Sequence, residues 1–486
     1  MSAANGAIQS ASFRDPSGFI FERGGTLYRQ VQREHGPEYD RLVDSGLYRV
    51  LTDAGLLIPH DEAPLSEAAL PGAHRVLRPE RIPFISFPYE WCFSQLKDAA
   101  LTTLRIQKEA LNHGMSLKDA SAYNIQFRAG RPILIDTLSF ESYEIGTPWK
   151  AYRQFCQHFL APLALMSHTD IRLGGLLRLH IDGIPLDLAG RLLPLRTRLN
   201  PGLVAHVHLH GAAQKRYADK PQQPSRSTAS MSRTGLLGLL DSLETTVRKL
   251  KWVPFGTEWA NYYDDTNYSD RAMEGKRCLV AEMLESMEPL PKSVWDLGAN
   301  TGVFSRIPSD TGAQTVAWDI DPAAVEKNYL ECRARGETRI LPLLQDLTNP
   351  SPDLGWAERE RESLSQRGPA DAVLALALIH HLAIGNNVPL PLVGQYLRKL
   401  GRWAIVEFVP KSDSQVLRLL SSREDIFPTY TREGFEAAFA PFFETCRTAD
   451  VPDSERTLFL LRGRELATPA DSTRMEADVA AAGQQA

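Results

Sequence analysis

The chain has 486 residues, of which 43% are hydrophobic and 23% are charged, a composition typical of a soluble globular protein with two or three domains. The formal net charge of −5 gives no electrostatic reason to expect a nucleic-acid partner. Five scattered cysteines without a CxxC pair argue against structural zinc and a disulfide framework. Because the sequence also shows no secretory signal and no apolar run of about 18 residues, we expect a cytoplasmic protein without a membrane span.

Polar, low-complexity segments divide the chain into domains. Residues 1–12 and 466–486 are rich in Ala, Ser, Gly and Gln and are predicted to be disordered tails. The segment 211–234 is polar, contains two prolines and several serines, and is typical of a linker. We therefore expect an N-terminal α+β accessory domain over residues 13–210 and a second domain over residues 235–465.

The N-terminal half contains one stretch with a chemical pattern, GMSLKDASAYNIQFRAGRPILIDTLSFE. Asp119 is followed five residues later by Asn124 and then by Asp136, and a long helix is predicted just before, over 95–114. This spacing resembles the catalytic and metal-binding segments of kinase-like phosphotransferases. The resemblance implies that Asp119 accepts a substrate proton while Asn124 and Asp136 hold magnesium.

The same stretch departs from the kinase pattern in several places. LKD stands where HRD is usual and DTL where DFG is usual, and no VAIK-like lysine is present. The alternative interpretation is an unrelated accessory domain in which these residues form turns and caps. We therefore assign no metal site. In either case we expect this half to help bind a substrate or a partner.

Strand and helix patterns alternate through the C-terminal half. Alternation of this kind predicts right-handed βαβ units and a mainly parallel sheet, whose ligands lie at the carboxyl ends of the strands. Asp321 and Thr431 are predicted helix N-caps, and Gly336 is a predicted helix stop. The expected strands are 292–298, 315–322, 339–347, 371–382, 402–410 and 456–464, and the expected helices are 322–336, 388–401 and 431–443.

A glycine-containing turn, DLGANTG, follows the first of these strands. The dinucleotide fingerprint GxGxxG fails here because Asn300 and Val303 stand where glycines are required. An acidic residue followed by GxGxG matches better, with Asp296, Gly298 and Gly302 in place and Asn300 at the middle glycine. Asparagine is the non-glycine residue that most readily adopts a left-handed conformation, so this replacement is mild.

The ordered set DLGANTG, AWDIDP, LLQDL, ALIHHL and IVEF resembles the class I S-adenosylmethionine-dependent methyltransferases. The resemblance implies an α/β fold with a Rossmann-like, seven-stranded, mainly parallel sheet that binds S-adenosyl-L-methionine. Asp296 would lie near the ammonium group, Asp319 would hold the ribose hydroxyls and Asp346 would accept from the adenine amino group. The implied cofactor-binding residues are Asp296, Gly298, Asn300, Gly302, Asp319 and Asp346.

Two adjacent histidines, His380 and His381, lie at the end of the expected fourth strand, where the reactive methyl group is expected. Either imidazole could accept a proton from an acceptor hydroxyl or amine, and the sequence does not separate the two. Glu407 after the fifth strand is a further polar candidate that could equally be structural. The aromatic segment 252–268 is expected to form one wall of the acceptor pocket.

The acceptor itself is expected to be a small or carrier-bound metabolite methylated on oxygen or nitrogen. ALIHH stands where an (N/D)PPY motif would indicate an exocyclic base amine, so no nucleic-acid substrate is expected. Two alternatives stay open: a bifunctional protein with an active N-terminal phosphotransferase, and a non-catalytic cofactor-binding protein. The layout as a whole resembles nodulation-type proteins, and the sequence does not fix the oligomeric state.

Overall fold

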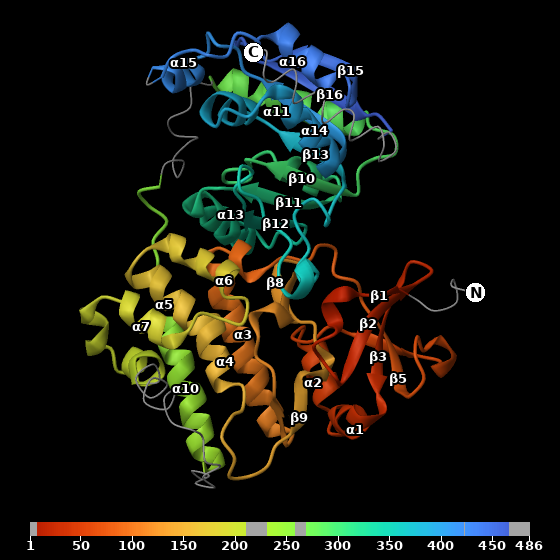
Figure 1. Ribbon diagram of the computed structural model, residues 1–486, viewed down its shortest axis with the longest axis vertical. Helices are drawn as coiled ribbons and strands as arrows, with labels where there is room; N and C mark the ends of the chain where they lie inside the picture. The colour runs from red at the N-terminus through yellow and green to blue at the C-terminus, as the bar shows by residue number, and fades with distance from the viewer. Residues whose placement is uncertain (1–6, 210–230, 258–268, 422, 466–486) are drawn as a thin grey trace. The chain divides into compact units, whose positions relative to one another are not determined.

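The computed structural model describes residues 7–209, 231–257, 269–421 and 423–465. The chain divides into two compact units. The first contains residues 1–253 together with 353–361, and the second contains 254–352 and 362–486. Figure 1 traces both units from the N-terminus to the C-terminus.

The first unit combines helices with antiparallel strands, as expected of an α+β domain. Its largest sheet has the order β1-β2-β3-β5-β4, and two hairpin-like pairs, β6–β9 and β7–β8, follow the long helix α3. The strands are β1 (Ala7–Ile8), β2 (Gly18–Arg23), β3 (Thr26–Gln32), β4 (His60–Ala63), β5 (Ala73–Pro79), β6 (Met115–Leu117), β7 (Ile125–Arg128), β8 (Arg131–Leu134) and β9 (Phe140–Ser142). The helices are α1 (Gly36–Asp44), α2 (Leu47–Asp53), α3 (Phe93–Asn112), α4 (Tyr152–Phe155), α5 (Ala161–His168), α6 (Leu176–Leu179), α7 (Leu186–Leu192), α8 (Pro201–Leu203) and α10 (Arg233–Lys249).

Three boundaries differ from the sequence prediction. Residues 7–8 of the expected tail pair with β2, and a short 3-10 turn follows at 10–12. Helix α10, expected in the second domain, packs in the first unit, where Lys108 reaches Asp241 and Glu244 at 2.6 Å each. Its buried leucine face has the helical spacing of a core helix, which the neighbouring linker composition concealed. The rest of the expected linker, 210–230, and the tail 466–486 lie outside the described residues.

The segment 353–361 is the third difference, because it belongs to the first unit although its neighbours on both sides belong to the second. Its anchor is Glu360, whose carboxylate accepts from the Arg14 guanidinium at 2.7 to 2.9 Å and from the Trp356 backbone N–H at 2.7 Å. A bidentate Arg–carboxylate pair of this kind is specific in geometry. The C-terminal domain is therefore not continuous in sequence.

The second unit is built on a seven-stranded sheet with the order β12-β11-β10-β13-β14-β16-β15. Strands β10 to β14 pair in parallel, and β16 runs antiparallel to both β14 and β15. This confirms the predicted seven-stranded, mainly parallel sheet. The strands are β10 (Ser293–Leu297), β11 (Gln314–Asp319), β12 (Ile340–Leu344), β13 (Ala370–Ala375), β14 (Gly401–Phe408), β15 (Phe443–Asp450) and β16 (Thr457–Gly463).

Helices cover the sheet of the second unit. The helix α13 lies along β11 and β12, and α14 lies against β14 (Figure 1). One core cluster joins α11 to β10, β13 and β14 through residues such as Val280, Val294, Leu374 and Ile405. The helices are α11 (Asp270–Glu285), α12 (Arg306–Asp310), α13 (Pro322–Arg335), α14 (Leu390–Leu400), α15 (Ser414–Leu420) and α16 (Arg432–Phe439).

The predicted helix caps at Asp321, Thr431 and Gly336 are confirmed, but the helix expected over 431–443 ends at Phe439, and Phe443 begins β15. Asp321 accepts from the backbone N–H groups of Ala323 and Ala324, and Thr431 accepts from that of Gly434. Gly336 ends α13 with φ of 67°.

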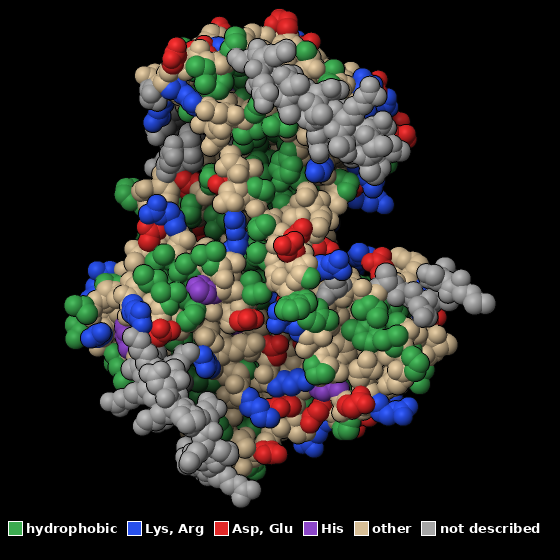
Figure 2. Space-filling model, viewed as in Figure 1, with side chains coloured by type: hydrophobic (Ala, Val, Ile, Leu, Met, Phe, Trp, Pro, Cys, Tyr) green, Lys and Arg blue, Asp and Glu red, His purple; other side chains and the backbone are tan. Residues whose placement is uncertain are grey.

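None of the helices in the described ranges is long and apolar enough to cross a membrane. On the face seen in Figure 2, charged side chains of both signs are interspersed.

Candidate functional site

A cavity of about 340 Å³ lies at the carboxyl ends of β10, β11 and β13. This is the edge at which parallel α/β sheets bind ligands, and the volume falls in the range of small-molecule sites. The cavity is lined by Met273, Lys276, Asp296, Gly298, Ala299, Asn300, Phe304, Asp319, Ile320, Leu376, Ala377, Leu378, His381, Gly385, Asn386 and Leu419. Five of the residues expected from the sequence to bind cofactor or acceptor are therefore brought together here.

The turn after β10 forms the floor of this cavity. Gly298, Asn300 and Gly302 all have left-handed backbone conformations, with φ of 78°, 49° and 78°. The left-handed conformation predicted for Asn300 is confirmed. Backbone N–H groups of Gly298 and Ala299 donate to the carbonyl of Trp318 at 2.9 and 2.8 Å, which attaches the turn to the end of β11. Because Gly298 has no side chain, a ligand can approach the backbone of the turn closely.

Two buried carboxyl groups, Asp296 and Asp319, face the cavity from neighbouring strands. Asp296 accepts from the Ser305 hydroxyl at 2.6 Å, and burial raises its pKa to about 7, with the nearby Asp319 adding to the shift. Asp319 accepts from the backbone N–H groups of Asn300 and Asp321 at 2.7 and 2.8 Å. Burial raises the pKa of Asp319 to about 6, although these hydrogen bonds oppose the shift. A cationic or hydroxyl-bearing ligand would therefore stabilise the ionised form of both carboxyl groups.

Lys276 on α11 is a cavity residue that the sequence analysis missed. Its ammonium group is 2.6 Å from Oε2 of Glu407 and 4.7 Å from the centre of the Phe304 ring, and its side chain is 3% exposed. Burial lowers the pKa of Lys276, while Glu407 and Asp296 oppose that shift. No local signal marks this lysine, because its partner lies 131 residues away along the chain.

Glu407 lies within β14 and is fully buried, with its carboxylate held by other groups of the protein. Its Oε2 accepts from Lys276 and from the backbone N–H of Ala377 at 2.6 Å, and its Oε1 lies 3.8 Å from Arg456. Arg456 in turn binds Asp413 at 2.7 Å. These contacts favour the structural alternative, in which Glu407 accepts hydrogen bonds within the fold, over a role in binding the substrate. It links α11 to the segment after β13.

The two histidines after β13 occupy different positions. His381 begins a π-helical turn, His381–Gly385, and lines the cavity, whereas His380 is 1% exposed and is absent from the lining. Burial lowers the pKa of His381 to about 4, with Arg456 contributing, and burial together with the neighbouring His381 also lowers the pKa of His380 well below its usual value. Both imidazoles are therefore neutral at physiological pH, and only His381 faces the cavity. π-helical turns are frequent at functional sites.

Comparisons with known proteins show the family of the chain. No model of a known protein family matches the chain. The nodulation protein NoeA of Rhizobium meliloti (strain 1021) is 35% identical over 463 residues, which cover 94% of this chain and 96% of the relative. The chain belongs to the NoeA family. This NoeA-family member spans nearly the whole length of that relative.

Solved structures similar to this NoeA-family chain include a methyltransferase and a bifunctional enzyme. Magnesium protoporphyrin IX methyltransferase (ChlM) from Synechocystis PCC 6803, with bound SAH, is 20% identical with a TM-score of 0.30, over 42% of this chain and 93% of the other. The bifunctional kinase-methyltransferase WbdD is 14% identical with a TM-score of 0.29, over 46% of each chain.

Some of the cofactor-binding residues predicted from the sequence motifs lie away from the cavity lining. Gly302 packs against α13, where a Cβ atom would lie 2.4 Å from Nδ2 of Asn328. Asp346 is half-buried, and its Oδ1 accepts from the backbone N–H and hydroxyl of Thr348 at 2.8 and 2.6 Å, so it closes a local turn. In the aromatic segment, Trp259, Tyr262, Tyr263 and Tyr268 lie outside the described residues.

In the N-terminal unit of this NoeA-family chain, the three kinase-like residues lie on the connections between β6 and β9. Asp119 accepts from the Ser121 N–H and from Gln154 at 2.9 and 2.7 Å, and burial raises its pKa. Asp136 is paired with Arg29 at 2.6 Å and caps the turn 137–139 through the Leu138 N–H. The contacts of Asp119 and Asp136 are therefore those of the alternative interpretation, in which these residues form turns and caps.

Magnesium binding by Asn124 and Asp136 is implied only by the kinase resemblance. No group of three or more His, Cys, Asp or Glu side chains suited to a metal ion occurs in the described part of the chain. Burial tends to raise the pKa of Asp136, but Arg29 and the hydrogen bonds outweigh it and lower that pKa. The carboxylate that the resemblance assigns to magnesium thus already has a cationic partner.

Proposed function

We propose that this protein is an S-adenosylmethionine-dependent methyltransferase that acts on oxygen or nitrogen of a small or carrier-bound metabolite. One observation carries the proposal: a turn with three left-handed residues, two buried carboxyl groups and a neutral histidine converge on one cavity at the carboxyl edge of a parallel sheet. These features match the cofactor's amino-acid end, ribose and reactive methyl group. When bound, the cofactor supplies an electrophilic methyl group on a sulfonium.

The charged residues suit the two ends of an amino acid. Asp296 can bind an ammonium group directly or through water, and the Lys276 ammonium at the same cavity can bind a carboxylate. Asp319 lies one strand away from Asp296, at the end of β11, where it can accept from two hydroxyl groups of a ribose. Ile320, which is 56% exposed and lines the cavity, offers an apolar surface for a nucleobase.

Apolar side chains also line the cavity that His381 enters. Met273, Leu376, Leu378 and Leu419 are among them, so packing can align the reacting groups. A neutral His381 can accept the proton that an acceptor hydroxyl or amine loses as it is methylated. Its position in the cavity makes His381, rather than His380, the acid–base candidate.

Calorimetric titration with S-adenosylmethionine and S-adenosylhomocysteine tests the proposal, with ATP and NAD as comparison ligands. We expect saturable binding of both sulfur compounds at one site and none of NAD. Absence of binding by the purified, folded chain would refute the proposal. Incubation with methyl-labelled cofactor and cell extract then identifies the acceptor class, and binding without any transfer of label would favour a non-catalytic cofactor-binding protein.

A second candidate function is phosphotransfer by the N-terminal unit. It is favoured by the arrangement in which α3 and β6 precede Asp119 and the β7–β8 pair precedes Asp136. The ion pair between Arg29 and Asp136 opposes it, because it occupies the carboxylate that would hold magnesium. Magnesium-dependent ATP binding that disappears in Asp136→Ala would support this activity, and absence of ATP binding would exclude it.

A further inference from the structure

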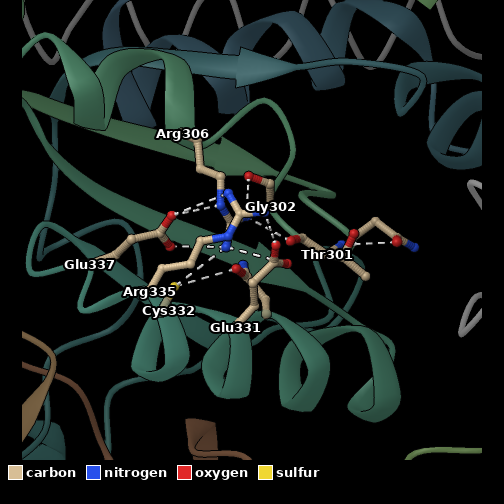
Figure 3. A network of polar contacts seen from close by, with 9 residues as sticks. Thr301, Gly302, Arg306, Glu331, Cys332, Arg335 and Glu337 are labelled. Carbon is tan, nitrogen blue, oxygen red and sulfur yellow. Dashed lines mark hydrogen bonds and ion pairs between the residues drawn. The ribbon is translucent and has the colours of Figure 1, made fainter. Parts of the chain in front are cut away.

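An arginine outside the cavity holds the far side of the glycine-containing turn. Nη1 of Arg306 donates to the backbone carbonyls of Gly302 and Thr301 at 2.8 and 3.0 Å. Its Nε and Nη2 donate to the two carboxylate oxygens of Glu337 at 2.9 and 3.0 Å. Figure 3 shows the guanidinium between the turn and Glu337. The side chain is 11% exposed, so these bonds are largely shielded from water.

The turn is therefore fixed at both ends. On the cavity side, Asp319 accepts from the Asn300 N–H, and on the other side Arg306 binds the next two carbonyls. The left-handed conformation of Asn300, a non-glycine residue, is one that surrounding contacts have to hold in place. Loss of the Arg306 bonds would let peptides 301 and 302 rotate, and the binding-competent turn would be populated less often.

Glu337 determines where the guanidinium can point. It follows the left-handed Gly336 at the end of α13, and its two oxygens orient the planar group toward the turn. A second carboxylate, Glu331, lies 3.5 Å away from Nη2. A lysine would keep the positive charge but lacks the planar fork whose separate N–H groups address the turn on one side and Glu337 on the other.

We infer that Arg306 is a positioning residue, which sets the affinity for S-adenosylmethionine by fixing the 298–302 turn without touching the ligand. The inference rests on the proposed function. It predicts an effect on cofactor affinity that is separable from the effect on folding, because the carbonyl bonds and the ion pair are made by different nitrogen atoms of the same side chain.

Four variants separate these roles when titrated with S-adenosylmethionine. Arg306→Lys is expected to weaken binding about tenfold or more, as loss of charge-assisted hydrogen bonds implies. The exchange R306E/E337R keeps an ion pair but removes the donors to the turn, so the melting temperature should recover relative to R306E while affinity stays low. R462M, which breaks the exposed Arg462–Glu444 pair in the same unit, is the control and should bind like the wild type.

Wild-type affinity in Arg306→Lys, or affinity that recovers together with the melting temperature in the exchange, would overturn the inference. Hydrogen exchange of the ligand-free protein gives a measurement that needs no cofactor: the amides of 298–303 should exchange faster in Arg306→Lys than in R462M, and equal rates would also overturn it. A wild-type protein that does not bind S-adenosylmethionine would instead refute the proposed function, a different result from any of these.

Discussion

Asp319 accepts the backbone N–H of Asn300 at 2.7 Å, so the residue proposed to hold the ribose also holds the turn proposed to approach the cofactor. The same carboxylate accepts from the Asp321 N–H at the start of α13. One carboxylate thus connects the ends of β10, β11 and the following helix. Changes at Asp319 should therefore affect the turn and the ligand together.

Asp319→Ala is expected to weaken S-adenosylmethionine binding by about 1.5–3 kcal/mol for each charge-assisted hydrogen bond that is lost. Asp319→Asn should lose less, because the amide oxygen can still accept from the Asn300 N–H. Asp346→Ala is the matched comparison, since Asp346 closes a turn with Thr348 and does not line the cavity. Titration calorimetry of the three variants measures the difference, and equal losses at positions 319 and 346 would contradict this account.

Cofactor affinity should depend on pH through Asp296 and Asp319, whose pKa values are raised to about 7 and about 6. A cationic ligand favours the ionised carboxylates, so affinity should rise between about pH 5.5 and pH 7.5 and then level off. Asp296→Asn should remove the upper part of this dependence. Affinity that is constant across this range would show that neither carboxyl group titrates on binding.

The same raised pKa values give the ligand-free protein a pH-dependent stability of definite sign. Between about pH 4 and pH 7 the folded state retains protons on Asp296 and Asp319 that the unfolded chain has already released. The contribution of these groups to the free energy of unfolding is therefore present below about pH 4 and is lost as pH rises through 6 to 7. Chemical denaturation of the wild type and of D296N/D319N across this range measures that contribution by difference, which should vanish in the double variant.

Removing one member of the buried Lys276–Glu407 pair should destabilise the second unit strongly. Both side chains are nearly inaccessible, so Lys276→Met leaves a buried carboxylate with less compensation, at a cost of about 3–5 kcal/mol. The double variant K276M/E407Q should recover part of this loss, because the amide can still accept from the Ala377 N–H. Denaturant unfolding measures both, with R462M as the exposed-pair control; a loss in K276M no larger than in the control would contradict the prediction.

Methyl transfer should depend on His381 more than on His380. His381→Ala should lower transfer of labelled methyl groups by roughly 10²–10⁴-fold if the imidazole accepts the acceptor's proton, with cofactor affinity little changed. His380→Gln keeps a polar side chain at a position outside the cavity lining and should retain most of the activity. Because the pKa of His381 is lowered to about 4, the pH profile of transfer should show no acidic limb near 6.5.

The sequence by itself determined the second unit's sheet type and three of its helix ends. The apolar strand patterns, the helical spacing and the caps at Asp321, Thr431 and Gly336 depend only on residues close together along the chain, so they can be predicted from the sequence. The left-handed Asn300 was predictable for the same reason, since backbone preference is a local property. By contrast, β15 (Phe443–Asp450) shows only one buried residue and a largely exposed edge, so its polar sequence carried no strand signal.

Only the tertiary structure decided which charged groups meet. Lys276 and Glu407 are 131 residues apart, Arg14 and Glu360 are 346 apart, and nothing in their surroundings along the chain indicates that they pair. The same holds for Arg306, whose role depends on carbonyl directions in a folded turn. Hydrophobic periodicity records burial one element at a time, whereas ion pairs between elements depend on how those elements pack. The motifs therefore predicted a cofactor, and the packing decided which residues line the cavity.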